Sequence, residues 1–291
     1  MYCSMEANSI IVRTMQAGDA AAAMNLSDAE GWNQTANDWN FLIAYPESIC
    51  VAAVLEKEII GTTTAINYSG RLAWIGMVLV NKAYRGRGIS KLLLDHVFAK
   101  LKHFPSVKLD ATAQGQQVYK KFGFKDEYPV ARMVNTEVKK TILPNGDAYP
   151  EQIRAKHIPE IIALDEIVFG VNRAPLIEML VETYPHKAWV LVRNNHVAGF
   201  ALGRDGSKYH HIGPVIAQTQ PDTNLLILHA LNQLAGKPAV ADVLCNKEEL
   251  LHLLTAIGFS TQRYFTRMYK AANPFPGISS KLYAICGPEF G

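Results

Sequence analysis

The segment Trp74–Leu94, WIGMVLVNKAYRGRGISKLLL, carries the residues whose types and spacing point most directly to chemistry. Its centre is a basic turn made of Arg85, Gly86, Arg87, Gly88, Ile89 and Ser90. Glycines let the backbone approach a ligand closely, and the first N–H groups of a helix that follows have no partner inside that helix, so an anion is favoured there. The two arginines suit phosphate oxygens. The turn therefore predicts a site for a pyrophosphate group.

The elements around this turn are a strand and a helix. The run Trp74–Val80 is short, apolar and rich in valine and isoleucine, which is typical of a strand. From Ile89 to Leu101 the apolar residues follow helical spacing. A strand, a glycine turn and the first turns of an amphipathic helix would hold the predicted anion at the helix N-terminus.

Composition narrows the class of protein. The chain has 291 residues, of which 49% are hydrophobic and 19% charged, so a core can form and disorder is not expected. The formal net charge is +3 without a long basic run, which argues against a nucleic-acid-binding protein. Neither a signal peptide nor a membrane span is recognisable. We expect a cytoplasmic enzyme without a membrane partner.

The cysteines favour the same compartment. Their positions are scattered, without a C-x-x-C pair: Cys3, Cys50, Cys245 and Cys286. Reduced thiols are the simpler interpretation, because a zinc site would need closer spacing or a paired histidine. We expect no metal.

A weak internal repeat organises the whole chain. Short matches recur in the same order, at an offset that drifts from 141 residues between Arg13 and Arg154 to 135 between Gly123 and Gly258. The other matches pair Tyr45-Pro46 with Tyr184-Pro185, Ile59-Ile60-Gly61 with Val197-Ala198-Gly199, and Arg132-Met133 with Arg267-Met268. One dipeptide match could be chance, but an ordered series indicates two copies of one fold.

The pattern of elements within one copy indicates an α+β fold. We expect a strand at Ile10–Thr14, helices across Ala17–Tyr45, and a hairpin of Ser48–Leu55 and Glu58–Tyr68. After the Trp74 strand and its helix, the sequence predicts a strand at 107–111, a helix at 115–121 and a last strand at 130–138. Each domain would be a mixed, mostly antiparallel sheet flanked by helices. The predicted domains are 1–140 and 151–291.

The first half resembles the GNAT superfamily of acetyl-CoA-dependent N-acetyltransferases. The family's turn, Gln/Arg-x-x-Gly-x-Gly/Ala after a strand, stands here as Arg85–Ser90, with Ser90 where glycine or alanine is usual. A second family mark is a tyrosine shortly before Gly-Phe, present as Tyr119 and Gly123-Phe124. The segment Leu109–Gly115 and the degenerate second half also look like a tandem branch of the superfamily.

The resemblance implies where acetyl-CoA would bind. The pyrophosphate would lie on the backbone N–H groups of Arg85–Ser90. The pantetheine arm would pair like a strand with the edge of the preceding strand, at Met77, Val78, Leu79 and Val80. A backbone N–H there would polarise the thioester carbonyl. Acetyl-CoA is the cosubstrate, and the amine would attack it directly in a ternary complex.

The resemblance also implies an acid, while the base stays open. Tyr119 would give a proton to the leaving CoA thiolate as general acid. Many family members have an acidic base on the strand before the turn, and Trp74–Val80 has none. Three possibilities stay open: Asp110 on the next strand acts as the base, directly or through water; Asp110 is a structural carboxylate; or the amine arrives neutral. For the acceptor we expect Trp32 or Trp39 in a pocket with Asn33 or Asp38, and we place Trp32, Asn33 and Asp38 there.

The second half lacks the same features. Its counterpart to the turn, residues 212–222, has no R-G-x-G and ends in Asp222, and Leu254 stands where Tyr119 would be. This copy should not bind CoA. We therefore expect an N-acetyltransferase acting on a primary amine of a small molecule. The alternatives are a non-catalytic CoA or ligand sensor and an acetyltransferase for protein N-termini or lysines. The chain could be a monomer or a homodimer.

Overall fold

The computed structural model describes residues 10–145 and 147–291, so Cys3 lies outside the described part. The chain divides into two compact units. The first unit holds the residues up to Asn67 together with Ala73–Phe104, and the second holds Tyr68–Leu72 and Pro105–Gly291. The predicted domains, 1–140 and 151–291, follow the sequence repeat and stay a prediction, whereas the two compact units follow the packing of the strands.

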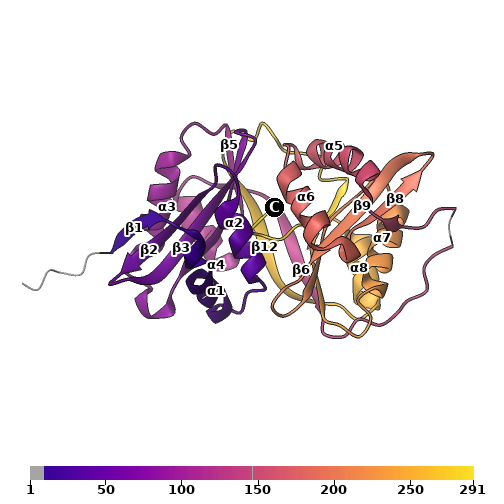
Figure 1. Cartoon of the computed structure of the whole chain (residues 1–291), viewed down its shortest axis with the longest axis horizontal. Helices are drawn as coiled ribbons and strands as arrows, with labels where there is room; N and C mark the ends of the chain where they lie inside the picture. The colour runs from indigo at the N-terminus through magenta and orange to yellow at the C-terminus, as the bar shows by residue number, and fades with distance from the viewer. Residues whose placement is uncertain (1–9, 146) are drawn as a thin grey trace, which may run out of the picture. The chain divides into compact units, whose positions relative to one another are not determined.

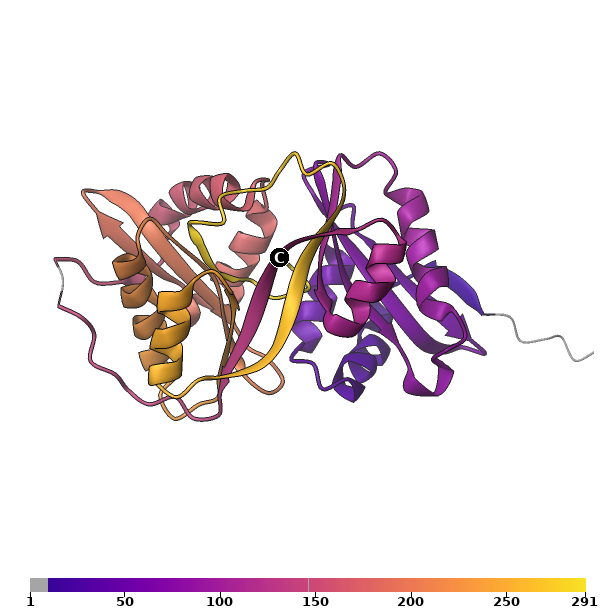
Figure 2. The same cartoon turned by 180° about the vertical axis from the view of Figure 1, so that it is seen from behind.

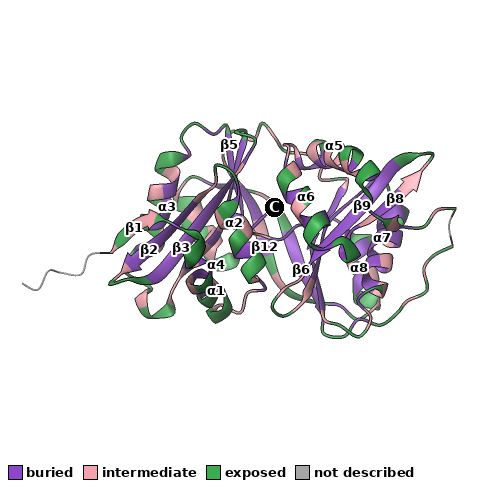
Figure 3. Cartoon of the chain, in the orientation of Figure 1, coloured by how far each residue is buried: buried purple, intermediate pink, exposed green. Residues whose placement is uncertain are grey.

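The first unit is a sheet with helices on both faces. Its strands follow the order β1 (Ile11–Thr14), β2 (Ile49–Leu55), β3 (Glu58–Tyr68) and β4 (Leu72–Val80). Helices α1 (Ala20–Ala29) and α2 (Ala36–Ala44) cover one face, and α3 (Ile89–Lys100) covers the other (Figures 1 and 2). Strand β2 is buried along most of its length, as its apolar sequence requires for a strand covered on both faces (Figure 3).

Local sequence accounts for the main turns of this unit. The hairpin of β2 and β3 turns at Glu56 and Lys57, as predicted, with φ of 51° and 88°. Two positive φ values fit a tight two-residue hairpin loop whose twist matches the strands. Helix α2 begins with a capping box in which Thr35 accepts from the Asp38 N–H and the Asp38 carboxylate accepts from the Thr35 N–H.

The second unit contains the last strands of both sequence copies. Its sheet runs β5 (Ser106–Thr112), β12 (Ser260–Ala271), β6 (Lys125–Asn135), β11 (Ala239–Leu244), β13 (Leu282–Ile285), β10 (His210–Ala217), β9 (His196–Arg204), β8 (Trp189–Arg193) and β7 (Glu151–Gln152). The pairs are antiparallel except for a short parallel stretch between β10 and β11. The sheet is mixed and mostly antiparallel.

Helices cover both faces of the second sheet as well. Helices α5 (Ile158–Phe169) and α6 (Ala174–Thr183) lie on one face, and α7 (Gln220–Asn232) and α8 (Glu248–Ala256) on the other (Figures 1 and 2). Helix α4 (Ala113–Lys121) follows β5 directly. The buried core between α7, α8 and the sheet is aliphatic, built largely from leucine, valine and alanine.

The two copies exchange their last strands. Strand β12 belongs to the second copy but pairs along its length with β5 and β6 of the first. Strand β6 belongs to the first copy but pairs with β11 of the second. The exchange draws β5, α4 and β6 into the second compact unit. Strand β6 also begins at Lys125 and ends at Asn135 rather than spanning 130–138, because the Asn135 side chain accepts from the Glu137 N–H and turns the chain.

Candidate active site

Two positions of the Arg85–Ser90 turn require glycine because of their backbone conformation, not because a side chain would clash with neighbouring atoms. Gly86 has φ of 78° and Gly88 has φ of 77°. A Cβ placed on either residue would meet no atom within 4 Å. Side chains disfavour this left-handed conformation, so glycine is needed for the turn to reach the N-terminus of α3 with its backbone exposed.

The N-terminus of α3 has no side-chain cap. Gly88 is its N-cap residue and offers no acceptor to the first N–H groups of the helix. Those N–H groups and the helix dipole favour a negative charge at this end. The turn therefore keeps the features that the sequence predicted for an anion site, namely free N–H donors, two glycines and neighbouring cationic side chains.

The two arginines of the turn have different environments. The Arg85 guanidinium donates from Nη2 to Glu30 at 2.5 Å and from Nε to the Val80 carbonyl at 3.2 Å. Arg87 is exposed and lies over the Tyr84 ring at 5.3 Å, with no ion pair among the described residues. The charge of Arg87 remains available to a ligand, whereas that of Arg85 is already partly neutralised.

Strand β4 carries a backbone irregularity where the resemblance places the thioester. Met77 has φ of 50°, which is uncommon for a residue with a side chain, and its carbonyl accepts from Thr62 Oγ1 at 2.9 Å. Such a residue interrupts the regular direction of the strand's N–H and C=O groups. Within Met77–Val80, Met77 and Leu79 are buried, and Val78 and Val80 are partly exposed.

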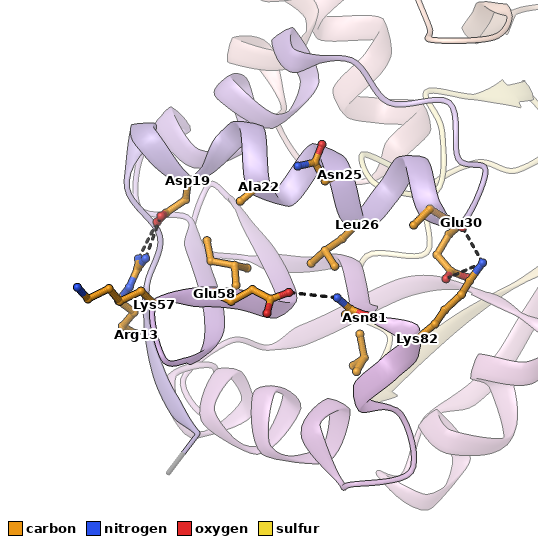
Figure 4. Close-up of a pocket in the computed structure, with 13 residues that line it drawn as sticks. Arg13, Asp19, Ala22, Asn25, Leu26, Glu30, Lys57, Glu58, Asn81 and Lys82 are labelled. Carbon is orange, nitrogen blue, oxygen red and sulfur yellow. Dashed lines mark hydrogen bonds and ion pairs between the residues drawn. The ribbon is translucent and has the colours of Figure 1, made fainter. Parts of the chain in front are cut away.

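A pocket lies beside the turn, within the first unit. It has a volume of about 510 Å³ and lies between α1, the β2–β3 turn and the end of β4 (Figure 4). Ala22, Leu26, Ile59 and Val80 supply apolar wall. Its polar groups are largely paired with one another, as in the hydrogen bond from Asn81 to Glu58 at 3.4 Å. This pocket is not predictable from the sequence, because the residues of its walls lie far apart in the chain.

The predicted acceptor residues have local structural partners. Asp38 is buried and holds the N-terminal cap of α2, so its carboxylate is engaged in that cap. Asn33 is buried and Trp32 is partly exposed, both in the segment between α1 and α2. Trp39 is fully buried and donates from Nε1 to Ser27 Oγ at 3.2 Å, which makes it the core tryptophan of the pair. An acceptor role for Trp32, Asn33 and Asp38 stays a prediction.

Tyr119 belongs to the second unit and is held by the end of α4. The Phe124 N–H donates to the Tyr119 carbonyl and the Gly123 N–H to the Lys120 carbonyl, with Gly123 at φ of 86°. This pair of bonds is a Schellman cap, which gives the Gly-Phe mark a physical reason. Gly115, one turn earlier, leaves room for the Tyr119 ring, because a Cβ there would lie 3.1 Å from it.

The environment of Tyr119 favours its protonated form. Tyr119 is half-buried, and its partial loss of solvation raises the pKa of the phenol. The described residues provide no hydrogen-bond partner for the Tyr119 hydroxyl. Tyr119 therefore holds a proton at neutral pH and has not committed it to another protein group.

Asp110 is engaged in an ion pair. Both of its oxygens accept from Arg267, from Nε and from Nη2, each at 2.9 Å. The Asp110 side chain is fully buried, and Arg267 also donates to the Tyr128 hydroxyl at 2.6 Å. This bidentate geometry favours the structural alternative over a role as general base.

In the second copy, the protein's own groups occupy the positions that correspond to the turn. Helix α7 starts at Gln220 with Thr219 as N-cap, whose hydroxyl accepts from the Asp222 N–H. The Asp222 carboxylate accepts from Thr219 Oγ1 at 2.7 Å and from Arg193 Nε at 2.8 Å. A carboxylate of the chain itself thus lies at the helix end where α3 is left uncapped.

The C-terminal segment of the chain lies against β10, the strand of the second copy that corresponds to β4. Strand β13 lies in this segment, at Leu282–Ile285. It pairs with β10 at Val215 and Ile216, which the repeat offset aligns with the region of Met77–Val80. It also pairs with β11 at Asp242 and Val243. The strand edge that would receive a pantetheine arm in this copy is therefore taken by the protein.

Comparison with known proteins finds a match to one acetyltransferase family in each copy of the repeat. The profile described as "Acetyltransferase (GNAT) family" matches residues 19–124, and that described as "Acetyltransferase (GNAT) domain" matches residues 161–284. The chain belongs to the GNAT superfamily of acetyltransferases, is an acyltransferase, and carries two such domains in tandem. The predicted α+β tandem fold is confirmed.

Three relatives cover most of the chain. Holothin acyltransferase from Pseudoalteromonas sp. (strain SANK 73390) is 26% identical over 264 residues, covering 90% of this chain and 88% of the relative. A putative acetyltransferase from Pyrococcus horikoshii has a similar structure, with a TM-score of 0.79, 22% identity, and coverage of 100% and 99%. A tandem GNAT protein from the clavulanic acid biosynthesis pathway gives a TM-score of 0.63 at 12% identity, covering 90% and 98%.

Two further findings concern the described residues as a whole. Helices of the described part are all too short or too polar to span a bilayer. The same residues contain no group of three His, Cys, Asp or Glu side chains arranged to hold a metal ion.

Proposed function

We propose that the chain transfers an acetyl group from acetyl-CoA to the primary amine of a small molecule, within a ternary complex. The observation that carries the proposal is the difference between the two helix N-termini. Helix α3 begins at Gly88 without a side-chain cap, whereas α7 begins at Thr219 with Asp222 in its first turn. One copy presents free N–H groups to an anion, and the other has satisfied them internally.

In this proposal the first copy binds CoA. The N–H groups of Gly86–Ser90 hold the pyrophosphate, and the edge of β4 at Met77–Val80 pairs with the pantetheine arm. The positive φ of Met77 turns its peptide groups out of the regular ladder, which supports a role for a nearby N–H as donor to the thioester oxygen. Arg87 adds positive charge at the phosphate end.

The chemical step needs one proton removed and one supplied. The neutral amine nitrogen attacks the carbonyl carbon, the C–S bond breaks, and the thiolate of CoA leaves with the electron pair. Tyr119 gives its phenolic proton to that thiolate. The nitrogen, which carries a positive charge after the attack, loses one proton to solvent to give the neutral amide, and solvent returns a proton to the Tyr119 phenolate. The Tyr119 phenol is protonated at neutral pH, and burial of the thiolate would raise the pKa of the CoA thiol, which favours transfer of the proton to sulfur.

The acceptor class rests on different support. A relative that aligns over 90% of this chain is named for one compound, holothin, rather than for a protein substrate. We propose a small-molecule amine on that ground, and the net charge of +3 gives no reason to prefer a polyanionic partner.

Release of the CoA thiol in the presence of a panel of primary amines tests the proposal. We expect turnover with at least one small amine, and Tyr119→Phe should lower kcat by about 100-fold or more while the Kd for CoA stays unchanged. Tyr264→Phe is the matched control, because Tyr264 is 60% exposed on β12. CoA binding without turnover by any amine would instead indicate a ligand sensor, and turnover of peptides alone a protein acetyltransferase.

A further inference from the structure

The carboxylate of Glu30 contacts the basic residues on one side of the CoA turn. Glu30 follows the last residue of α1 and accepts from Arg85 Nη2 at 2.5 Å. Lys82 Nζ lies 3.8 Å from the same carboxylate and donates to the Ala29 carbonyl at 2.7 Å (Figure 4). The C-terminal end of α1 thus holds two cations that lie before the glycines of the turn.

These contacts connect segments that are far apart in the sequence. Glu30 and Arg85 are separated by 55 residues. Arg85 also donates to the Val80 carbonyl, so its guanidinium bridges the end of β4 and the end of α1. The negative end of the α1 dipole adds to the attraction for both cations. The bridge restrains the turn at the residue that precedes Gly86.

We infer that Glu30 is a positioning residue for acetyl-CoA binding, acting through Arg85, while Arg87 is the arginine of the turn that faces the phosphates. This inference rests on the proposed function, because it assumes that the turn binds CoA. Glu30 holds the side chains of Arg85 and Lys82 against the end of α1. This restraint fixes the conformation of the turn, so that the N–H groups of Gly86–Ser90 point towards the phosphate site before CoA binds. Preorganisation of this kind lowers the cost of binding.

The inference predicts an effect opposite in sign to simple electrostatics. CoA is a polyanion, so removing a negative charge near its site should strengthen binding if charge alone mattered. Freeing Arg85 for a phosphate should strengthen binding too. If Glu30 positions the turn, its loss should weaken binding. An exposed ion pair contributes up to about 1 kcal/mol, so the expected rise in Kd is about 2- to 5-fold.

Calorimetric titration with CoA, together with steady-state kinetics in acetyl-CoA, provides the test. Glu30→Gln should raise the Kd for CoA and the KM for acetyl-CoA, with kcat unchanged. The matched control is Glu56→Gln, which removes the same charge from an exposed position on the β2–β3 turn of the same unit. Tighter or unchanged CoA binding by Glu30→Gln, relative to Glu56→Gln, would overturn the inference.

Exchange of the two charges separates positioning from direct contact. Arg85→Glu and Glu30→Arg should each weaken CoA binding, and the double variant should recover most of the loss because the pair is restored. If Arg85 itself touched a phosphate, the double variant would bind as weakly as Arg85→Glu. If the wild-type protein does not bind CoA, both the proposed function and this inference are wrong. If the wild type binds CoA and Glu30→Gln binds it with the same Kd, only this inference is wrong.

Discussion

Asp110 on β5 and Arg267 on β12 face each other in register and form a buried bidentate ion pair, although they come from different copies of the repeat. The mirror pair joins Arg132 on β6 to Asp242 on β11, at 2.8 Å for both hydrogen bonds. Each arginine lies on an exchanged strand and pairs with an aspartate of the other copy. The repeated Arg-Met dipeptide of the sequence is therefore a mark of strand exchange.

Asp110→Asn should mainly destabilise the fold. It would leave the buried Arg267 charge without the carboxylate that pairs with it, because an asparagine oxygen and the Tyr128 hydroxyl are neutral acceptors. Breaking one partner of a buried pair costs about 3–5 kcal/mol. Unfolding in urea measures this loss. Replacing both partners, as in Asp110→Leu with Arg267→Met, should cost less than Asp110→Asn, because no uncompensated charge remains. If Asp110→Asn kept full stability and lost kcat, Asp110 would be the base.

The sequence predicted the local elements well because their signals are local. Glycines that recur between the copies have the same cause in each. A Cβ on Gly61 would lie 2.9 Å from the Leu79 carbonyl oxygen, and one on Gly199 would lie 2.7 Å from that of Ile216.

Gly258 ends α8 as Gly123 ends α4, with the Phe259 N–H donating to the Leu254 carbonyl. The same cap in both copies also confirms the alignment of Leu254 with Tyr119.

Strand partners and the Glu30 contact were beyond the sequence for a physical reason. Alternation of apolar residues predicts that a segment is a strand but not which strand it pairs with. The sequences of β6 and β12 are therefore equally compatible with pairing inside their own copies and with the exchange between copies. A half-buried glutamate 55 residues before its arginine partner belongs to no recognisable sequence pattern. The sequence leaves Asp110 open as a general base or a structural carboxylate, because its partner, Arg267, lies 157 residues away.

Gly88→Ala should weaken CoA binding beyond its effect on stability. An alanine held at φ of 77° destabilises the fold by about 1 kcal/mol. No neighbouring atom confines the added methyl group, so we expect the backbone of the turn to shift and relieve this strain. Gly70→Ala is a close control, since Gly70 has φ of 69° and equally open surroundings in the β3–β4 hairpin. Both should lose similar unfolding free energy. A Kd for CoA equal in the two variants would mean that the Gly88 backbone does not contact the ligand.

One chain should bind one CoA. The second copy has its helix end capped by Thr219 and Asp222 and its strand edge covered by β13, so it offers neither part of the site. Calorimetry should give a stoichiometry near one. Arg87→Glu, which places a negative charge at the turn of the first copy, should abolish binding altogether. A weaker site that survives Arg87→Glu would place a second ligand in the other copy.

His211 should make the protein sensitive to mild acid. It is fully buried on β10, with Nε2 3.2 Å from Asp242 Oδ2, and Arg132 and Arg204 lie close enough to oppose its protonation. Burial, more than these charges, lowers the pKa of His211 below its usual value near 6.5. The folded state therefore binds fewer protons than the unfolded state once pH falls below about 6.5.

The sign of the effect follows from that difference in bound protons. Stability from His211 is fully present above about pH 6.5 and is lost as pH falls towards the lower folded-state pKa, with a slope of up to about 1.4 kcal/mol per pH unit. His211→Gln keeps an amide donor for Asp242 but cannot titrate. Urea unfolding between pH 7.5 and 5 should show a shallower pH dependence for His211→Gln than for the wild type. Equal slopes would assign the acid sensitivity to the other histidines, which both proteins share.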